Sequence, residues 1–209
     1  MISGTIARAS LRVLTRLLAG LSFAVMPLAS SLAEELRSAQ SWGLEALMLE
    51  LGRVQHTKAN FVERKYFKIL KTPLVLTGTL EYSAPDHLER RTVTPKPESF
   101  VVDGERLTLE NTRGQRRSFA LQDNPVLWAF VESIRSTLKG DLAMLDRFYA
   151  VALDGGSEAW QLSLTPKESR MSALISLIRI DGSGGRIESI EIREAQGDRS
   201  VMTVREDGS

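Results

Sequence analysis

The spacing of apolar side chains changes along the chain from helical to alternating. Between residues 36 and 58 apolar residues recur at steps of three and four, which predicts a helix with one apolar stripe. From residue 59 onwards apolar and polar residues alternate in short runs separated by Pro, Gly and Asp, which is typical of antiparallel strands. The expected strands of this first half lie at 59–70, 74–82, 87–94, 100–102, 106–110 and 116–121.

Turn and cap residues divide the rest of the chain. Asp103-Gly104 between two strand-like runs predicts a tight hairpin. Asp123-Asn124-Pro125 is a typical helix start, and Gly140 a typical helix end, so a helix is expected between them with a short second helix from Leu142 to Phe148. Further strands are expected at 148–154, 159–165, 172–180, 186–194 and 199–205.

These elements predict a mainly β fold with added helices. Short strands joined by tight turns favour an antiparallel sheet that curls towards a barrel. A barrel of about ten to eleven strands encloses more space than its own side chains fill. We therefore expect a half-open, incomplete antiparallel β-barrel, covered by the helical segments as a plug or lid.

The first 33 residues have the pattern of a secretory signal peptide. Three arginines precede an apolar run from Leu17 to Leu28, and Ser31-Leu32-Ala33 fits a cleavage site between small residues. The apolar run is short and contains Pro27, which disfavours the alternative of an N-terminal membrane anchor. We expect residues 1–33 to be removed and residues 34–209 to work as one domain in the periplasm.

Charge and cysteine content exclude several functions. The predicted signal holds three of the 27 basic residues and none of the 26 acidic ones, which leaves residues 34–209 with a formal charge of −2. Nucleic-acid binding would require a basic excess, so no nucleic-acid partner is expected. The chain has no cysteine, which excludes disulfides, thiol catalysis and cysteine metal sites.

Residues for catalysis are scarce. His56 and His87 belong to no metal-binding spacing, and Gly182-Ser183-Gly184-Gly185 is better explained as a hairpin turn than as a nucleophile elbow. We expect no enzyme activity, no metal and no cofactor, although an exported hydrolase with a poorly visible site is an alternative that ester substrates would test.

The large apolar side chains allow two interpretations. They either form a solid core or line a cavity for acyl chains, and the pattern alone does not separate the two. The candidate cavity residues, with inward positions assigned by regular strand alternation, are Phe61, Leu76, Leu80, Tyr82, Phe100, Val102, Leu107, Leu109, Trp128, Phe130 and Phe148.

Several segments, in order, resemble the LolA-like family of periplasmic lipoprotein carriers. The segments are Ala59–Arg64 after the first helix, Gly78–Tyr82, Val101–Leu107 with its Asp-Gly turn, Trp160–Lys167, and the closing strands from Ile187 to Ser200. The similarity spans nearly all of residues 40–205.

The resemblance implies a function. Members of this family shield the acyl chains of lipoproteins in a hydrophobic cavity and carry them from the inner to the outer membrane. It implies an inner-membrane releasing complex and an outer-membrane acceptor as partners, and a monomeric carrier. A lipid- or lipoprotein-sensing domain of the same fold, without a transport role, is the alternative.

One position departs from the family pattern. The best-known carriers have an arginine before the proline that follows the second strand, and it bonds to the lid. Here that position is Ala84, before Pro85. Arg90 and Arg91 are the candidates to replace this arginine, and the difference is compatible with a related lipid as cargo.

Overall fold

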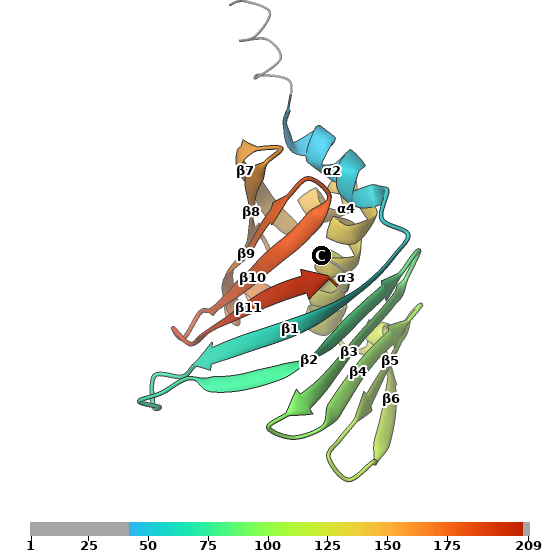
Figure 1. Cartoon of the computed structure of the whole chain (residues 1–209), viewed down its shortest axis with the longest axis vertical. Coiled ribbons are helices and arrows are strands. Elements are labelled where there is room, and N and C mark those ends of the chain that lie inside the picture. Colours follow the sequence, from blue (N-terminus) through green and yellow to red (C-terminus); the bar gives the residue numbers. More distant parts are fainter. Residues whose placement is uncertain (1–41, 207–209) are drawn as a thin grey trace, which may run out of the picture. The chain divides into compact units, whose positions relative to one another are not determined.

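An antiparallel sheet accounts for most of the computed structural model, which describes residues 42–206 (Figure 1). Its eleven strands in this range follow the order β6-β5-β4-β3-β2-β1-β11-β10-β9-β8-β7. They are β1 His56–Tyr66, β2 Leu74–Ser83, β3 His87–Thr94, β4 Glu98–Asp103, β5 Arg106–Glu110, β6 Arg116–Ala120, β7 Tyr149–Gly156, β8 Ala159–Pro166, β9 Ile175–Ser183, β10 Arg186–Glu194 and β11 Arg199–Glu206.

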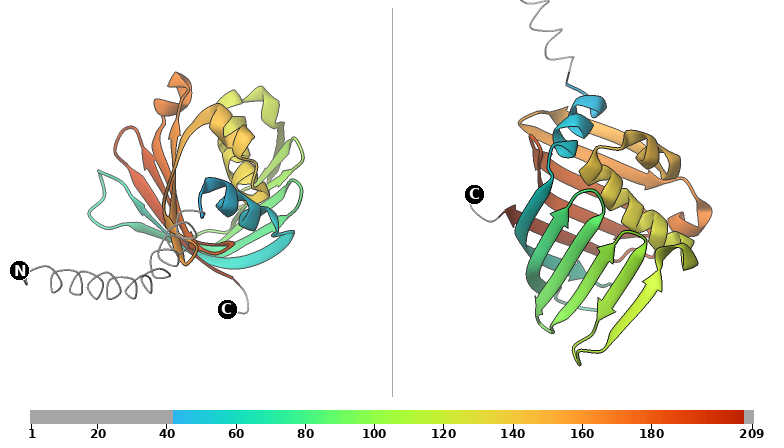
Figure 2. Two further views of the ribbon diagram at one scale, coloured as in Figure 1. Left: turned by 90° about the horizontal axis from the view of Figure 1, so that it is seen from above. Right: turned by 90° about the vertical axis from the view of Figure 1, so that its right-hand side faces the viewer.

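The two end strands of this sheet, β6 and β7, do not pair with each other, so the sheet curls without closing. The chain between them forms the short 3₁₀ helix η1 Leu121–Asp123, then α3 Pro125–Lys139 and α4 Leu142–Phe148. Figure 2 shows these helices on the inner side of the curled sheet. The half-open antiparallel barrel of ten to eleven strands with a helical cover, predicted from the sequence, is confirmed.

Helix α3 begins and ends where the sequence predicts. The Asn124 side chain accepts a hydrogen bond from the Leu127 backbone N–H at 3.1 Å, and Pro125 occupies the first turn. The helix ends at Gly140, whose φ of 68° is the left-handed conformation that glycine adopts at low cost. Asp141 then caps α4 by accepting from the Met144 N–H at 3.0 Å.

The expected first helix was too long. Helix α2 spans Leu44–Gly52 and strand β1 already begins at His56, so the predicted helical residues 56–58 lie in the sheet. Pairing of His56 with Ser83 of β2 outweighs the local helical spacing. Residues 36–41 and the predicted signal peptide lie outside the described residues. The short helix α5, Ser169–Ser172, was not predicted.

Two buried apolar clusters hold the sheet and the helices together. The larger cluster comprises Leu47, Met48, Leu51, Ala129, Leu145, Tyr149, Trp160, Leu162, Leu164, Met171, Ile178 and Ile180. The smaller one comprises Val102, Leu107, Leu121 and Val131. Trp128 of α3 packs against both. Helix α3 therefore joins the two halves of the sheet across its inner side.

Glycines allow α2 to approach the end of α3 closely. A Cβ built on Gly140 would lie 1.9 Å from the Met48 carbonyl oxygen, and one on Gly52 would lie 2.7 Å from the Lys139 carbonyl oxygen. Both neighbours are backbone atoms, which do not move aside as a flexible side chain would. The close contact between the two helices thus requires glycine, which has no side chain, at both positions.

We predict that Gly140→Ala destabilises the protein more than Gly114→Ala does. Both glycines have left-handed φ values, 68° and 73°, but nothing lies within 4 Å of a Cβ at Gly114. Gly114→Ala should cost about 1–2 kcal/mol of unfolding free energy from backbone conformation, and Gly140→Ala about 1–3 kcal/mol more from the clash. Urea unfolding of both variants measures this, and equal losses would contradict the close approach.

Candidate functional site

The inner face of the curled sheet is the candidate site, because α3 covers it and the predicted apolar residues point to it. Tyr82, Leu88, Val102 and Leu107 form one cross-strand row, and Val102 and Leu107 pack with Val131 of α3. Strand alternation then assigns further positions to this face. Predicted residues on it are Phe61, Leu76, Leu80, Tyr82, Phe100, Val102, Leu107 and Leu109.

Six of the eleven predicted residues pack against or within the buried clusters, and one of them, Trp128, packs against both. Val102 and Leu107 are buried in the smaller cluster, with Phe100 against it. Phe130 and Phe148 pack against the larger one, where Phe148 meets Trp128 edge-on with ring centroids 5.2 Å apart. These six residues form core between sheet and helices.

The other five predicted residues belong to neither cluster. Phe61 and Tyr82 are nearly fully buried, Leu76 and Leu80 are half-buried, and Leu109 is 38% exposed. Half-buried Met202 and Val204 of β11 continue the same face beside Glu63 and Phe61. The inner face therefore carries a strip of apolar side chains on β1, β2 and β11 that lies outside both clusters.

A buried ion pair crosses this apolar strip. Glu63 of β1 is 4% exposed and accepts a hydrogen bond from Nη2 of Arg90 at 2.5 Å. The Arg90 guanidinium also lies 4.8 Å from the centroid of the Phe61 ring. A buried carboxylate is tolerated when it is paired in this way. Lys65 lies 3.8 Å from the same carboxylate, so the inner face combines apolar contact area with a small charged group that was not predicted from the sequence.

A second buried charge ties α3 to two turns of the sheet. Arg135 is 5% exposed, and its Nη1 donates to the Gly104 carbonyl oxygen at 3.2 Å. Its Nη2 lies 3.8 Å from Asp86, and Nη1 lies 3.6 Å from Glu132. Gly104 belongs to the β4–β5 turn and Asp86 to the β2–β3 turn. One side chain therefore holds the lid helix to both hairpin ends.

Arg135, and neither Arg90 nor Arg91, is the arginine that connects lid and sheet. Arg90 pairs with Glu63, and Arg91 pairs with Glu89 on the outer face. The position before Pro85 is occupied by Ala84, whose N–H donates to the Gln55 carbonyl oxygen. Burial raises the pKa of the nearby Tyr82 hydroxyl, and the positive charge of Arg135 partly offsets this rise. Arg90 and Arg91, the candidates named from the sequence, thus pair with carboxylates of the sheet.

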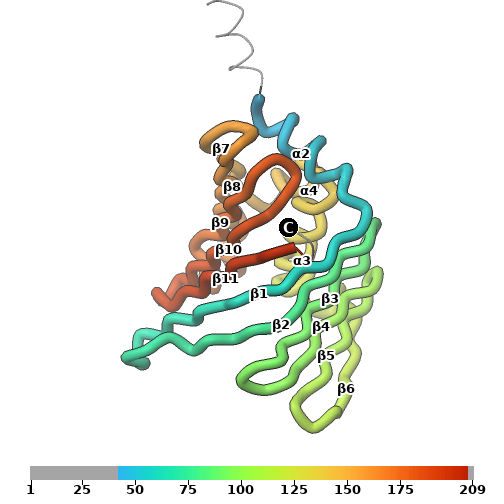
Figure 3. The backbone as a smooth tube through the Cα atoms, in the orientation of Figure 1, coloured from blue at the N-terminus to red at the C-terminus, as the bar shows by residue number. Residues whose placement is uncertain are grey.

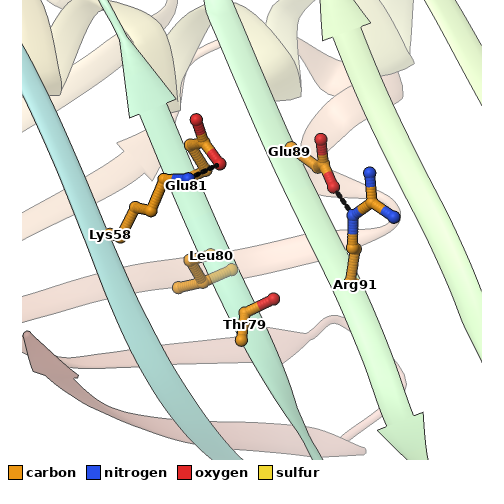
Figure 4. Close-up of a pocket in the computed structure, with 6 residues that line it drawn as sticks. All are labelled: Lys58, Thr79, Leu80, Glu81, Glu89 and Arg91. Atoms are coloured by element: carbon orange, nitrogen blue, oxygen red, sulfur yellow. Dashed lines mark ion pairs between the residues drawn. The ribbon is translucent and has the colours of Figure 1, made fainter. Parts of the chain in front are cut away.

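A depression of about 340 Å³ on the outer face is a different kind of surface (Figure 4). Its lining comprises Thr79, Leu80 and two ion pairs, Lys58 with Glu81 at 3.0 Å and Arg91 with Glu89. The hydrogen bond from Lys58 lowers the pKa of Glu81. Charged walls of this kind do not suit an acyl chain.

The histidines also lie on the outer face. His56 Nδ1 is 2.8 Å from Ser83 Oγ, and His87 Nδ1 is 3.8 Å from Asp103 Oδ1. The sequence analysis missed the proximity of His56 and Ser83, which are 27 positions apart. Among residues 42–206 no group of three or more His, Asp or Glu side chains is arranged to hold a metal ion.

An open antiparallel sheet with helices across its inner face, and apolar side chains between the two, defines the class of this protein. The chain belongs to the outer membrane lipoprotein carrier protein LolA-like family, whose sequence profile matches residues 37–205. No curated protein matches the chain.

The solved structures to which the chain is similar share little sequence with it. A LolA superfamily protein from Nitrosomonas europaea is 11% identical, with a TM-score of 0.39 over 79% of this chain and 90% of that one. A putative outer membrane lipoprotein-sorting protein domain from Vibrio parahaemolyticus is 10% identical, with a TM-score of 0.42 over 80% and 93%. MucB in the Pseudomonas aeruginosa MucA/MucB complex is 14% identical, with a TM-score of 0.47 over 79% and 57%.

In the part of the chain that the structure describes, no helix has the length and apolar character needed to span a membrane.

We predict that Arg135→Met loosens the lid. The substitution removes the hydrogen bond to Gly104 and leaves Glu132, whose side chain is 11% exposed, without its cation. Loss of a charged hydrogen bond should cost about 1.5–3 kcal/mol of unfolding free energy. Amide hydrogen exchange in α3 should become faster by the factor that corresponds to this loss of free energy.

The matched control is Arg116→Met, which removes an exposed pair with Glu110 and should cost less than about 1 kcal/mol. Unchanged exchange in α3 of the Arg135→Met variant would show that this arginine does not hold the lid.

Proposed function

We propose that the protein carries acylated cargo, lipoprotein or a related lipid, through the periplasm with the acyl chains held between α3 and the inner face of the sheet. The observation that carries the proposal is the strip of half-buried apolar residues, Leu76 and Leu80 among them, that lies on this face outside both clusters. Membership in the LolA-like family supports it.

The physical need for such a strip is clear. Each methylene of an acyl chain exposed to water costs about 0.8 kcal/mol, so a chain that leaves a membrane requires continuous apolar cover. Leucine and phenylalanine side chains provide it without directional demands. The pair of Glu63 with Arg90 adds polar partners at one point of the strip, which suits an amphiphile whose acyl chains end in a polar linkage.

The lid fits a carrier that must also release its cargo. The Arg135 guanidinium connects helix α3 to the sheet turns through two contacts, with Gly104 at 3.2 Å and Asp86 at 3.8 Å. Because a buried charge without partners is unfavourable, the lid opens when a partner supplies new contacts for this guanidinium. We propose that the cargo passes from an inner-membrane releasing complex to an outer-membrane acceptor, and that the protein performs no catalysis.

Native mass spectrometry tests the proposal directly. The protein, purified from the periplasm without detergent, should carry a mass increment that corresponds to a lipid or a lipoprotein. The N-terminus found in the same spectrum tests cleavage after Ala33. A clean mass without ligand, together with no uptake of fluorescent acyl probes, would contradict the carrier function.

We predict that Leu80→Arg lowers the affinity for a fluorescent acyl probe at least about tenfold, because it places a charge beside Arg90 on the apolar strip. Since Leu80 is only half-buried, the variant should stay folded.

The matched control is Leu49→Arg on α2, where the side chain is 62% exposed and binding should not change. Circular dichroism and thermal melting check the fold of both variants. A Leu80→Arg protein that binds the probe normally would place the cargo elsewhere, and one that unfolds would show a solid core.

A further inference from the structure

The β1–β2 hairpin ends in an unusual surface. Ile69 is 90% exposed and Leu70 is 50% exposed, and Leu74 and Val75 follow with 39% and 43%. These four are among ten large apolar residues exposed in the described part of the chain, so such residues are concentrated at this tip. Single exposed apolar residues need no explanation, but a contiguous group marks an interaction site.

The same hairpin is strongly basic. Between Glu63 and Glu81 the sequence has four basic residues, Arg64, Lys65, Lys68 and Lys71, and no acidic one. Lys68 and Lys71 flank the exposed Ile69-Leu70 pair directly and are themselves exposed. Arg199 on the neighbouring strand has its guanidinium 4.3 Å from the centroid of the Tyr66 ring, and its charge is offset by Glu191 at 3.7 Å, so the lysines of the tip supply the uncompensated charge.

The tip is held in place by the adjacent β10–β11 turn. The Lys68 backbone N–H donates to Asp198 at 2.9 Å, and the Leu70 N–H donates to the Phe67 carbonyl oxygen at 3.0 Å. The Lys68 side chain passes over Gly197, where a Cβ would lie 2.3 Å from Lys68 Cε. Figure 1 and Figure 3 show the hairpin extending beyond the neighbouring strands. The apolar pair is therefore presented outwards by a defined structure.

We propose that this tip, residues 67–75, docks the protein on an anionic lipid bilayer, with Ile69 and Leu70 inserted at the interface and the lysines against lipid phosphates. Aliphatic side chains enter the headgroup–acyl boundary, and basic residues beside them gain from the negative surface potential. A protruding pair of side chains buries far less area than the roughly 1,200–2,000 Å² of a stable protein interface, which favours a membrane over a protein partner.

The inference goes beyond the proposed function and does not depend on what the inner face of the sheet binds. A protein that binds no acyl probe would still dock on vesicles, and a carrier that meets only protein partners would not. The two proposals therefore fail separately.

The test uses the exported protein, with its N-terminus established, and vesicles of phosphatidylglycerol and phosphatidylethanolamine. Vesicles of phosphatidylcholine alone serve as the neutral comparison. We expect flotation with the anionic vesicles, weaker flotation at 0.5 M salt because the Debye length falls to about 3–5 Å, and little with the neutral ones. Equal binding to both vesicle types, or no binding, would overturn the proposal.

Substitutions separate the two parts of the tip. The double variant Ile69→Ser, Leu70→Ser should weaken vesicle binding at least about tenfold. The double variant Lys68→Glu, Lys71→Glu should weaken it at least about twentyfold, because each lysine raises the affinity for an anionic membrane about fivefold. The controls are Leu49→Ser and Arg186→Glu, both exposed and located before β1 and at the start of β10. Controls that weaken binding as much as the tip variants would contradict docking by this hairpin.

The absence of cysteine from the chain permits a direct readout of insertion. An environment-sensitive fluorophore on Ile69→Cys should shift to the blue and brighten with anionic vesicles, whereas the same label on Leu49→Cys should not. Leu49 precedes strand β1 and Ile69 follows it, so the two labels lie at opposite ends of this 11-residue strand. A label at position 69 that stays in water while the protein floats would overturn the insertion step.

Discussion

The open edge of the sheet is the constraint on which the rest of this structure depends. Because β6 and β7 do not pair, the inner face remains larger than its own side chains can cover. The chain meets this demand with the segment that connects the two edges, so α3 and α4 lie across the inner face of the sheet. Trp128, which packs against both clusters, is where this cover joins the two halves.

Charge placement then determines how firmly the cover is held. Arg135 and Glu63 are both about 95% buried, and each is compensated by partners from a different element. A buried charge that loses its partner is strongly unfavourable, so these pairs specify one arrangement more than they add net stability. The pair of Glu63 with Arg90 fixes β3 against β1, whereas Arg135 fixes the lid against the hairpin turns. Lid and sheet are thereby secured independently.

Local signals in the sequence predicted most of the fold and little of the site's electrostatics. Asp103-Gly104, Asn124-Pro125 and Gly140 each specify a turn or a helix end by their own backbone preferences, and all three behave as predicted. The helix forecast through residue 58 failed because pairing with β2 overrides local spacing. The partners that tie these residues to other elements are far away along the chain: Arg90 lies 27 residues from Glu63, and Gly104 and Asp86 lie 31 and 49 residues from Arg135. Alternation marked Glu63 only as a polar position within a strand, and no local pattern reveals its burial.

Strand β1 links the candidate acyl site on the inner face with the exposed tip of the β1–β2 hairpin. It pairs along nearly its whole length with β2 on one side and β11 on the other, which makes it a central strand of the sheet. Its inner face presents Phe61 and Glu63 to the candidate acyl site, and the exposed tip begins where it ends. A central strand is among the last parts of a sheet to open. The tip and the inner face therefore keep a fixed relation, so a membrane bound at the tip would meet the candidate site in one orientation.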